Sequence, residues 1–238
     1  MIRLPGDEDR ISIIGKTGSG KTIAGLAHLS VRSYTSQPWI IYNFKGDKNI
    51  NAIRRARPLQ LPMVPDQPGL YVVRPRWDEI ELLNQHFRAI WERGRVGLYV
   101  DEGYMIGSRN EWFRTILTQG RSLEIPTIML MQRPVFVDRF LLSESEFYQI
   151  FQLNDKKDRK IVEEYLPDSV DISRRLPRFH SYYYDSSEDT FTTLKPVPAI
   201  QDILQVFDER LARLDEEELR QQNVIPLDMV PVRKVRVI

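Results

Sequence analysis

The sequence predicts an α/β fold in which a mostly parallel central sheet is flanked by helices. Short apolar runs alternate with segments of helical periodicity along most of the chain, which is typical of repeated strand–helix units. One run, Val96–Val100, is continuously apolar, as expected for a strand that is buried on both faces. A glycine-rich loop at residues 15–22 joins the first expected strand to the first expected helix.

The expected elements follow from periodicity and from residues that start or stop them. Apolar runs place strands at about residues 10–14, 38–44, 70–73, 96–100, 125–131 and 147–153. Helical spacing places helices at 21–34, 77–93, 111–123, 154–165 and 200–221, with Asn154 as a cap. A hairpin is expected within 178–196, and 45–68 reads as irregular. We expect one domain over residues 1–238, with a core at about 8–170 and a C-terminal hairpin, helix and basic tail at about 171–238.

The composition excludes several function classes. The 238 residues include no cysteine, which rules out disulfides and thiolate metal sites. The histidines His28, His86 and His180 have no ligand spacing, and no apolar stretch is long enough to span a membrane. The early acidic segment Asp7–Asp9 is unlike a signal peptide, so we expect a soluble intracellular protein. A net charge of +1 leaves only local clusters as evidence for a polyanionic partner.

Residues 15–22 form a complete phosphate-binding motif. They are Gly15, Lys16, Thr17, Gly18, Ser19, Gly20, Lys21 and Thr22. The glycines let backbone N–H groups turn toward phosphates, and the following helix offers its positive end to the same anion. The motif predicts that Lys21 reaches the β- and γ-phosphates and that Thr22 binds Mg²⁺. The sequence has no Asn-Lys-x-Asp motif for guanine recognition, which favours ATP over GTP as the cofactor.

A pair of acids, Asp101 and Glu102, ends the apolar run. Parallel strands open onto the ligand crevice at their carboxyl ends, so Asp101 is expected to hold Mg²⁺ or its water ligands. Glu102 is expected to orient and polarise the attacking water as general base. The second acid favours hydrolysis of ATP over transfer to a small-molecule hydroxyl. A small-molecule kinase and a nucleotide-switched assembly protein stay open as alternatives of different classes.

The segment after the acids resembles a known family. Gly120-Arg121 follows the acidic strand, and the next apolar strand ends in Gln132-Arg133-Pro134. With the phosphate loop and the acid pair, over about residues 10–135, this pattern resembles the FtsK–HerA superfamily of DNA-translocating ATPases. The resemblance implies a RecA-like core, a homo-oligomeric ring that is usually a hexamer, ATP at the subunit interfaces and double-stranded DNA in the channel. It also implies that Gln132 senses the γ-phosphate and that Arg121 is offered to the neighbour's ATP.

The compact size favours one branch of that superfamily. The chain reaches its phosphate loop by residue 15 and ends soon after the expected core. Such a motor resembles the genome-packaging ATPases of membrane-containing viruses with double-jelly-roll capsids. Packaging implies a capsid vertex or portal protein as a partner, and a location in the host cytoplasm or on the virion. An ATPase that mobilises plasmid or chromosomal DNA is the alternative within the superfamily.

Basic clusters are candidate DNA contacts, with solvated surface charge as the simpler explanation for each. They are Arg54–Arg57, Arg74–Arg76, Lys156–Lys160, Arg174–Arg178 and Arg233–Arg236. The loop Gly103–Asn110 follows the acids and is well placed to couple hydrolysis to movement. Alternation of Tyr182 and Tyr184 in the hairpin predicts a two-faced ribbon that packs against the core.

Overall fold

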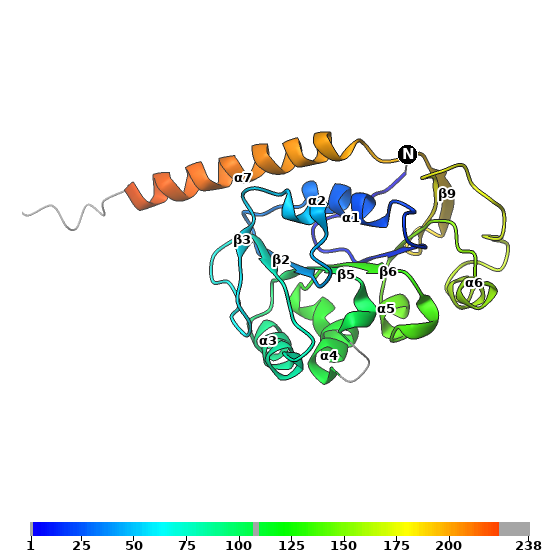
Figure 1. Cartoon of the computed structure of the whole chain (residues 1–238), viewed down its shortest axis with the longest axis horizontal. Helices are drawn as coiled ribbons and strands as arrows, with labels where there is room; N and C mark the ends of the chain where they lie inside the picture. Colours follow the sequence, from blue (N-terminus) through cyan, green and yellow to red (C-terminus); the bar gives the residue numbers. More distant parts are fainter. Residues whose placement is uncertain (1, 107–109, 224–238) are drawn as a thin grey trace, which may run out of the picture.

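The computed structural model describes residues 2–106 and 110–223, and a nine-stranded sheet runs through this part of the chain (Figure 1). The strands lie in the order β3-β4-β2-β5-β6-β1-β7-β8-β9. They are β1 (Ile11–Ile14), β2 (Pro38–Asn43), β3 (Arg57–Pro58), β4 (Gly69–Val73), β5 (Gly97–Asp101), β6 (Thr127–Met131), β7 (Phe147–Ile150), β8 (Ser181–Asp185) and β9 (Thr190–Leu194). Strands β1 to β7 pair in parallel, and β8 and β9 extend the sheet antiparallel from β7.

Helices cover both faces of the sheet, as the alternating sequence pattern predicts. They are α1 (Lys21–Ser30), α2 (Lys48–Asn51), α3 (Ile80–Arg93), α4 (Glu111–Gln119), α5 (Phe140–Ser143), α6 (Lys156–Glu163) and α7 (Ile200–Asn223), with 3₁₀ turns η1 (Gly103–Met105), η2 (Gly120–Leu123) and η3 (Pro134–Phe136). Figure 1 shows α1, α2 and α7 on one face and α3, α4, α5 and α6 on the other. Each face buries its own hydrophobic core, so the parallel strands read as continuous apolar runs.

The strand order brings three functional segments to one edge of the sheet. β6 lies between β5 and β1, with Ile14 level with Met131 and Tyr99 level with Ile128. These strands are parallel, so the residues at and just beyond their ends emerge together at the carboxyl edge. The phosphate loop follows β1, the acids end β5, and Gln132 follows β6.

Several element boundaries differ from those expected. α3 begins at Ile80 rather than at residue 77, because the Glu79 carboxylate accepts a hydrogen bond from the Arg76 N–H and closes a turn there. Asp155, and not Asn154, caps α6 by accepting hydrogen bonds from two backbone N–H groups. The segment 45–68, expected to be irregular, contains the short helix α2 and the edge strand β3.

The helix expected over 111–123 changes type at Gly120. α4 ends at Gln119, and the 3₁₀ turn η2 continues to Leu123. At this point the buried guanidinium of Arg10 donates hydrogen bonds to helix carbonyls, including that of Ile116 at 3.1 Å. A Cβ atom at residue 120 would lie only 3.2 Å from that guanidinium. Gly120 therefore gives Arg10 the space to bind the end of the helix.

The expected C-terminal hairpin and helix are both present. β8 pairs with β7, and its tyrosines alternate between the two cores: Tyr182 and Tyr184 pack into one and Tyr183 into the other. α7 packs against α1 and β4 with Phe207 and Leu211 buried. Within residues 2–106 and 110–223, the structure contains no helix with the length and apolar character of a membrane span.

Candidate active site

The phosphate loop lies between β1 and α1. The N–H of Gly15 donates to the carbonyl of Met131 at 3.1 Å, which ties the loop to the neighbouring strand β6. Gly20 has a φ of 104°, a left-handed conformation that favours glycine, directly before α1. The Lys21 ammonium donates to the carbonyl of Lys16 at 3.2 Å, so the side chain lies back along the loop. The helix N-terminus and the ammonium thus face the same space, which suits a phosphate group.

A pocket of about 330 Å³ opens between this loop and the end of β5. Lys21 and Thr22 line one side, and Asp101 and Glu102 line the other. The remaining lining side chains come from the segment after β2 and from a distant loop; they include Lys45, Asp47, Asn49 and Phe179. The structure therefore brings together the four residues that the sequence assigns to phosphate, metal and water.

Two charged groups of this pocket, Asp101 and Lys21, are poorly solvated, and burial shifts the pKa of each. Burial raises the pKa of Asp101 to about 6, and the neighbouring carboxylates of Glu102 and Asp47 act in the same direction. Burial lowers the pKa of Lys21 below its ordinary value, against the attraction of Glu102 and Asp101. A bound phosphate would compensate the ammonium, and a divalent cation would compensate the carboxylates.

The donor set of the pocket fits Mg²⁺. This ion usually takes one or two protein oxygen ligands and completes its shell with water and substrate phosphates. Thr22 and Asp101 line the same pocket, and two further carboxylates, Glu102 and Asp47, line it as well. Across the described residues, no group of three or more His, Cys, Asp or Glu could hold a metal without a substrate. Phosphate oxygens would therefore supply the other ligands.

Glu102 adopts an unusual conformation at the pocket wall. Its φ is 68°, in the left-handed region that residues other than glycine rarely use. Its Oε1 accepts a hydrogen bond from the Lys45 ammonium at 2.7 Å, while Oε2 is buried and has no hydrogen-bond partner in the described part of the chain. A buried carboxylate oxygen without a partner is costly, so Oε2 is suited to receive an incoming water.

Sequence motifs do not identify Lys45 as a site residue. It follows β2, and it reaches Glu102 because β2 pairs with β5 in the sheet. Partial burial opposes its charge, but the hydrogen bond to Glu102 raises the pKa of Lys45 above its ordinary value. The two residues are 57 positions apart. No motif spacing in the sequence could have linked them.

Gln132 and Arg121 lie at opposite edges of the sheet. Gln132 follows β6 at the carboxyl edge, between the strand of the acids and the strand of the phosphate loop. Arg121 lies in η2, and its guanidinium pairs with Glu146 at 3.1 Å beside the amino end of β7. A four-residue strand such as β1 spans on the order of 13 Å, which separates Arg121 from the phosphate loop of its own chain. The Arg121 side chain is 76% exposed and accessible to a neighbour.

The basic clusters have different environments. Arg175 and Arg178 border the phosphate loop instead of forming a separate surface. Arg55 and Arg57 each form an ion pair with Asp215 of α7, so these two arginines have a structural role. Arg109 of the loop Gly103–Asn110 and the tail cluster Arg233–Arg236 lie outside the described residues.

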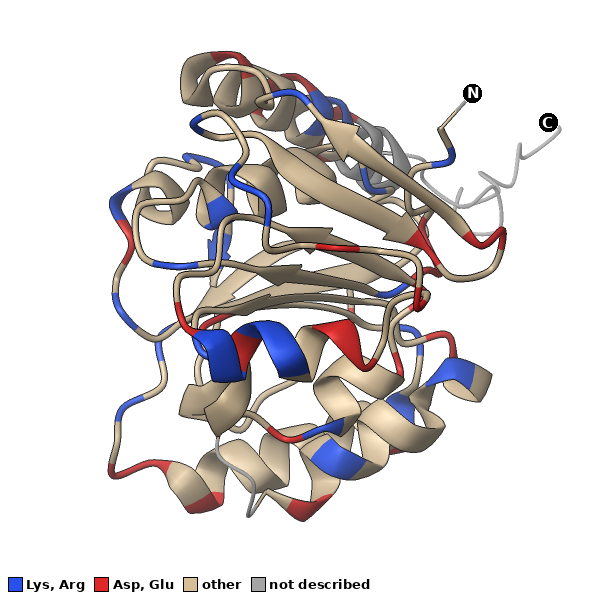
Figure 2. Ribbon diagram, turned by 90° about the vertical axis from the view of Figure 1, so that its right-hand side faces the viewer, with Lys and Arg blue, Asp and Glu red and all other residues tan. Residues whose placement is uncertain are grey.

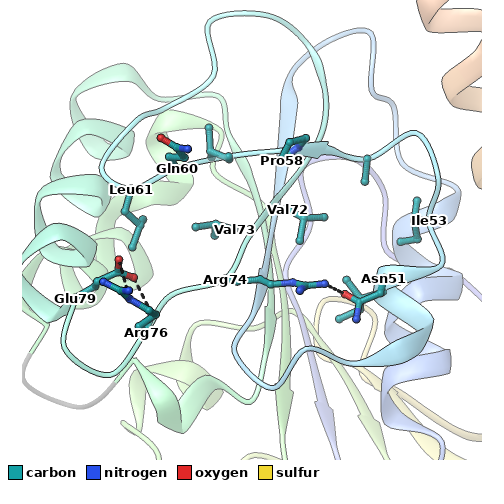
Figure 3. Close-up of a pocket in the computed structure, with 13 residues that line it drawn as sticks. Asn51, Ile53, Pro58, Gln60, Leu61, Val72, Val73, Arg74, Arg76 and Glu79 are labelled. Carbon is teal, nitrogen blue, oxygen red and sulfur yellow. Dashed lines mark hydrogen bonds and ion pairs between the residues drawn. The ribbon is translucent and has the colours of Figure 1, made fainter.

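A hollow of about 670 Å³ lies at the β3–β4 edge, away from the phosphate loop. Figure 3 shows the cluster Arg74–Arg76 here, with Arg74 bonded to Asn51 and Arg76 paired with Glu79. Both arginines are therefore engaged within the chain.

The cluster on α6 is largely exposed. Lys156, Lys157 and Lys160 are exposed, and Figure 2 shows basic residues along α6 with acidic residues at both of its ends. The acids Asp155 and Asp158 at the start of α6 suit the positive end of the helix dipole, whereas Lys156 and Lys157 in the same turn do not gain from it.

The fold and the pocket define a P-loop ATPase with an α/β, RecA-like core. The chain is 43% identical over 218 residues to the DNA packaging ATPase P9 of Enterobacteria phage PRD1, a match that covers 87% of this chain and 95% of that protein. The chain belongs to this family of DNA packaging ATPases. No protein-family model matches the chain.

Solved structures share the fold at low sequence identity. The genome packaging NTPase B204 from Sulfolobus turreted icosahedral virus 2, in complex with AMPPCP, has a TM-score of 0.62 and 16% identity, with 81% of this chain and 100% of that chain covered. Its complex with AMP has a TM-score of 0.64 at 16% identity, with 82% and 100% covered. EssC from Geobacillus thermodenitrificans has a TM-score of 0.58 and 15% identity, with 92% of this chain and 46% of that chain covered.

Proposed function

We propose that this protein is an ATP-hydrolysing motor that translocates double-stranded DNA and packages a viral genome into a preformed capsid. The observation that carries the proposal is the convergence of Lys21, Asp101 and Glu102 on one pocket, in a chain that belongs to the DNA packaging ATPases. The motor acts as a homo-oligomeric ring, a hexamer, around the DNA. It docks on a capsid vertex or portal protein, in the host cytoplasm or on the virion. All 238 residues serve as one ATPase domain.

The pocket residues divide the chemistry of hydrolysis. Lys21 and the loop N–H groups bind the β- and γ-phosphates of ATP. Thr22 and Asp101 hold Mg²⁺, which neutralises phosphate charge when it is bound. Water attacks the γ-phosphorus, the bond from that phosphorus to the β–γ bridging oxygen breaks, and ADP leaves. Glu102 takes the proton of the attacking water on Oε2, while Lys45 fixes the other carboxylate oxygen.

Two further residues couple the subunits. Gln132 follows β6 at the carboxyl edge, and we assign it to respond to the γ-phosphate. It directly precedes Arg133, whose guanidinium pairs with Asp158 of α6 at 2.7 Å. A change at the nucleotide can thus reach α6, whose exposed lysines we assign to DNA phosphates. Arg121 acts on the ATP of the neighbouring subunit, because it is distant from its own phosphate loop.

DNA-stimulated ATPase activity tests this function. Long double-stranded DNA at low salt should raise the hydrolysis rate of the assembled wild-type protein, and rising salt should weaken the effect steeply. The Lys21→Ala variant should be inactive with and without DNA. Equal rates with and without DNA, in a protein shown to be oligomeric, would reject the motor and favour a kinase or a nucleotide switch.

A further inference from the structure

A second cavity, of about 750 Å³, lies beside the phosphate loop on the side away from the acids. Its walls are the loop residues 16–19, the residues Phe151 and Gln152 after β7, and the segment 175–180 before β8. Phe179 lines both this cavity and the phosphate pocket, as do Thr17 and Gly18. The two spaces are therefore neighbours along the carboxyl edge, and Phe179 belongs to the walls of both.

The charges of the two spaces are different. The phosphate pocket contains Asp47, Asp101 and Glu102. The lining of the second cavity contains three cations, Lys16, Arg175 and Arg178, and includes no aspartate or glutamate. An environment of this kind suits an anionic group that carries no metal ion, which excludes the γ-phosphate end of a nucleotide and fits its α-phosphate end.

Phe179 has features that core packing does not explain. Its φ is 64°, a left-handed conformation that is unfavourable for a bulky side chain. The residue is 41% exposed, and the Arg178 guanidinium lies 4.6 Å from the ring centroid. The ring also lies close to the loop, since a Cβ atom at Gly20 would be 3.4 Å from it. An exposed aromatic ring in a strained conformation beside a phosphate loop points to a ligand that stacks on it.

Gln152 adds a directional polar group to the same cavity. Its Oε1 accepts a hydrogen bond from the Leu176 N–H at 3.3 Å. This contact orients the carboxamide so that its NH₂ group is the part left to donate. The adenine of ATP presents ring nitrogens that accept such a bond.

From these contacts we propose that the second cavity is the nucleoside subsite, in which a purine base stacks on Phe179. Gln152 donates a hydrogen bond to the base, and Arg175 and Arg178 neutralise the α-phosphate side of the nucleotide. This inference rests on the proposed function, because it requires that ATP phosphates occupy the loop. It also reassigns two arginines of the cluster 174–178 from a DNA surface to the nucleotide.

The test compares ATP with inorganic tripolyphosphate, which has the phosphates but no base. Affinities are measured for the assembled wild-type protein, for Phe179→Ala, and for Phe179→Trp, which keeps an aromatic surface. Phe136→Ala is the matched control, because Phe136 is 70% exposed, has the Arg133 guanidinium 5.2 Å from its ring, and lines neither space. Phe179→Ala loses the stacking contact with the base. Its affinity for ATP should therefore be roughly 5- to 100-fold lower than that of the wild type, and its affinity for tripolyphosphate should be unchanged. Phe179→Trp and Phe136→Ala should bind ATP as the wild type does.

The possible failures are distinguishable. If Phe179→Ala weakens ATP and tripolyphosphate equally, Phe179 only supports the loop and the base subsite is wrong. Unchanged ATP affinity in Phe179→Ala also overturns it. A variant with Arg175→Ala and Arg178→Ala that loses DNA but keeps ATP would return these arginines to the DNA surface. If the wild type binds neither ATP nor tripolyphosphate, the proposed function itself fails, whatever Phe179 does.

Discussion

The carboxylate of Glu102 is divided between two environments. One oxygen is held by Lys45 at 2.7 Å, and the other is buried without a partner in the described residues. Glu102 directly follows Asp101, the last residue of β5, and its left-handed backbone turns its side chain into the pocket. A residue held in this way, in a conformation that costs free energy, is suited to act on a water molecule at a defined position.

Replacement of Glu102 by glutamine should separate binding from hydrolysis. Glu102→Gln keeps the shape of the side chain but removes the group that accepts the proton of water. We expect ATP affinity close to that of the wild type and turnover lower by on the order of 10²-fold or more. Steady-state hydrolysis and equilibrium nucleotide binding measure the two quantities. Glu164→Gln, an exposed residue on the surface, is the control and should keep full turnover. Unchanged turnover in Glu102→Gln would assign the base to another acid.

The sequence predicts some site residues and not others for a physical reason. Lys21, Thr22, Asp101 and Glu102 belong to local motifs whose strand and helix contexts are readable from the chain. Lys45 enters the site only through strand pairing, and Phe179 only through a long loop that returns to the phosphate loop. Such contacts depend on sheet order, which periodicity along one sequence does not specify.

Helix α6 carries acids and bases at both ends. Asp155 caps its N-terminus and Asp158 lies in its first turn beside Lys156 and Lys157, while Lys160 lies in its last turn. The acids at the start of the helix suit its dipole, whereas Lys156 and Lys157 do not gain from it. Binding of DNA phosphates would give the exposed lysines a function.

Removal of the α6 lysines should change the salt dependence of DNA binding. In a variant with Lys156, Lys157 and Lys160 replaced by alanine, the slope of log affinity against log salt should decrease by about 3, since each phosphate contact contributes about 0.9. A variant with Arg88→Ala and Arg95→Ala removes exposed cations elsewhere and is the control. DNA titrations over a range of salt concentrations give both slopes. Equal slopes would remove α6 from the DNA surface.

A buried histidine joins α3 to the sheet. The Nδ1 of His86 lies 3.3 Å from the carbonyl of Pro62, and its Nε2 lies 2.8 Å from the Tyr42 hydroxyl. A carbonyl only accepts hydrogen bonds, so Nδ1–H is the donor and Nε2 accepts from tyrosine. Burial lowers the pKa of His86 to about 4, because the imidazolium would lose its hydration.

This histidine should make stability depend on pH in a predictable direction. Between its ordinary pKa of 6.5 and its folded pKa of about 4, the unfolded chain binds a proton that the folded chain does not. Folding is therefore weakened as pH falls, with a contribution from His86 of about 2 kcal/mol between pH 7 and pH 5. At pH 7, His86→Leu should have a lower free energy of unfolding than the wild type, because Tyr42 loses its hydrogen-bond acceptor. At pH 5, this deficit in the free energy of unfolding should be smaller by the contribution of His86. Denaturant unfolding at both pH values measures the deficit. A deficit that stays constant would contradict the lowered pKa.

Sequence patterns predict buried strands more reliably than helix ends. Strands β1, β2, β5 and β6 are predicted because each is buried on both faces and is rich in apolar residues. Helix ends are less predictable, because side chains from distant elements decide them. The guanidinium of Arg10 ends α4 by binding its carbonyls, although Arg10 lies more than 100 positions away. The edge strand β3 has only two residues, which is too short for any period to be visible.

At the scale of the whole molecule, the proposed catalytic residues do not share one edge. The phosphate loop, the acids and Gln132 lie at the carboxyl edge, and Arg121 lies at the amino edge beside Glu146. An exposed arginine on the opposite edge cannot stabilise phosphate charge in its own subunit. In a ring, the same side chain is available to the ATP of the next subunit. We therefore expect hydrolysis to require assembly.

Mixed rings test whether Arg121 acts between subunits. Arg121→Ala and Lys21→Ala should each be inactive, and a mixture of them should regain activity, because some interfaces pair an intact Lys21 with an intact Arg121. An arginine that acted within its own subunit could not restore activity, since every subunit would lack part of its own site. Arginine fingers contribute roughly 10³- to 10⁵-fold in rate, so even partial recovery stands above background.

The mixing experiment depends on subunit exchange and on assembly of both variants, which sedimentation and exchange of labelled subunits establish first. Arg95→Ala mixed with Lys21→Ala is the control, because Arg95 is also exposed and ion-paired but is not assigned to the site. In that mixture, activity should follow the fraction of Arg95→Ala subunits with no additional gain. The hydrolysis rate per wild-type subunit should also rise with protein concentration as rings form. Inactive mixed rings, or full activity in dilute monomer, would place the role of Arg121 within its own subunit or outside catalysis. The assignments of Lys21, Asp101 and Glu102 would be unaffected, because they rest on the pocket at the carboxyl edge.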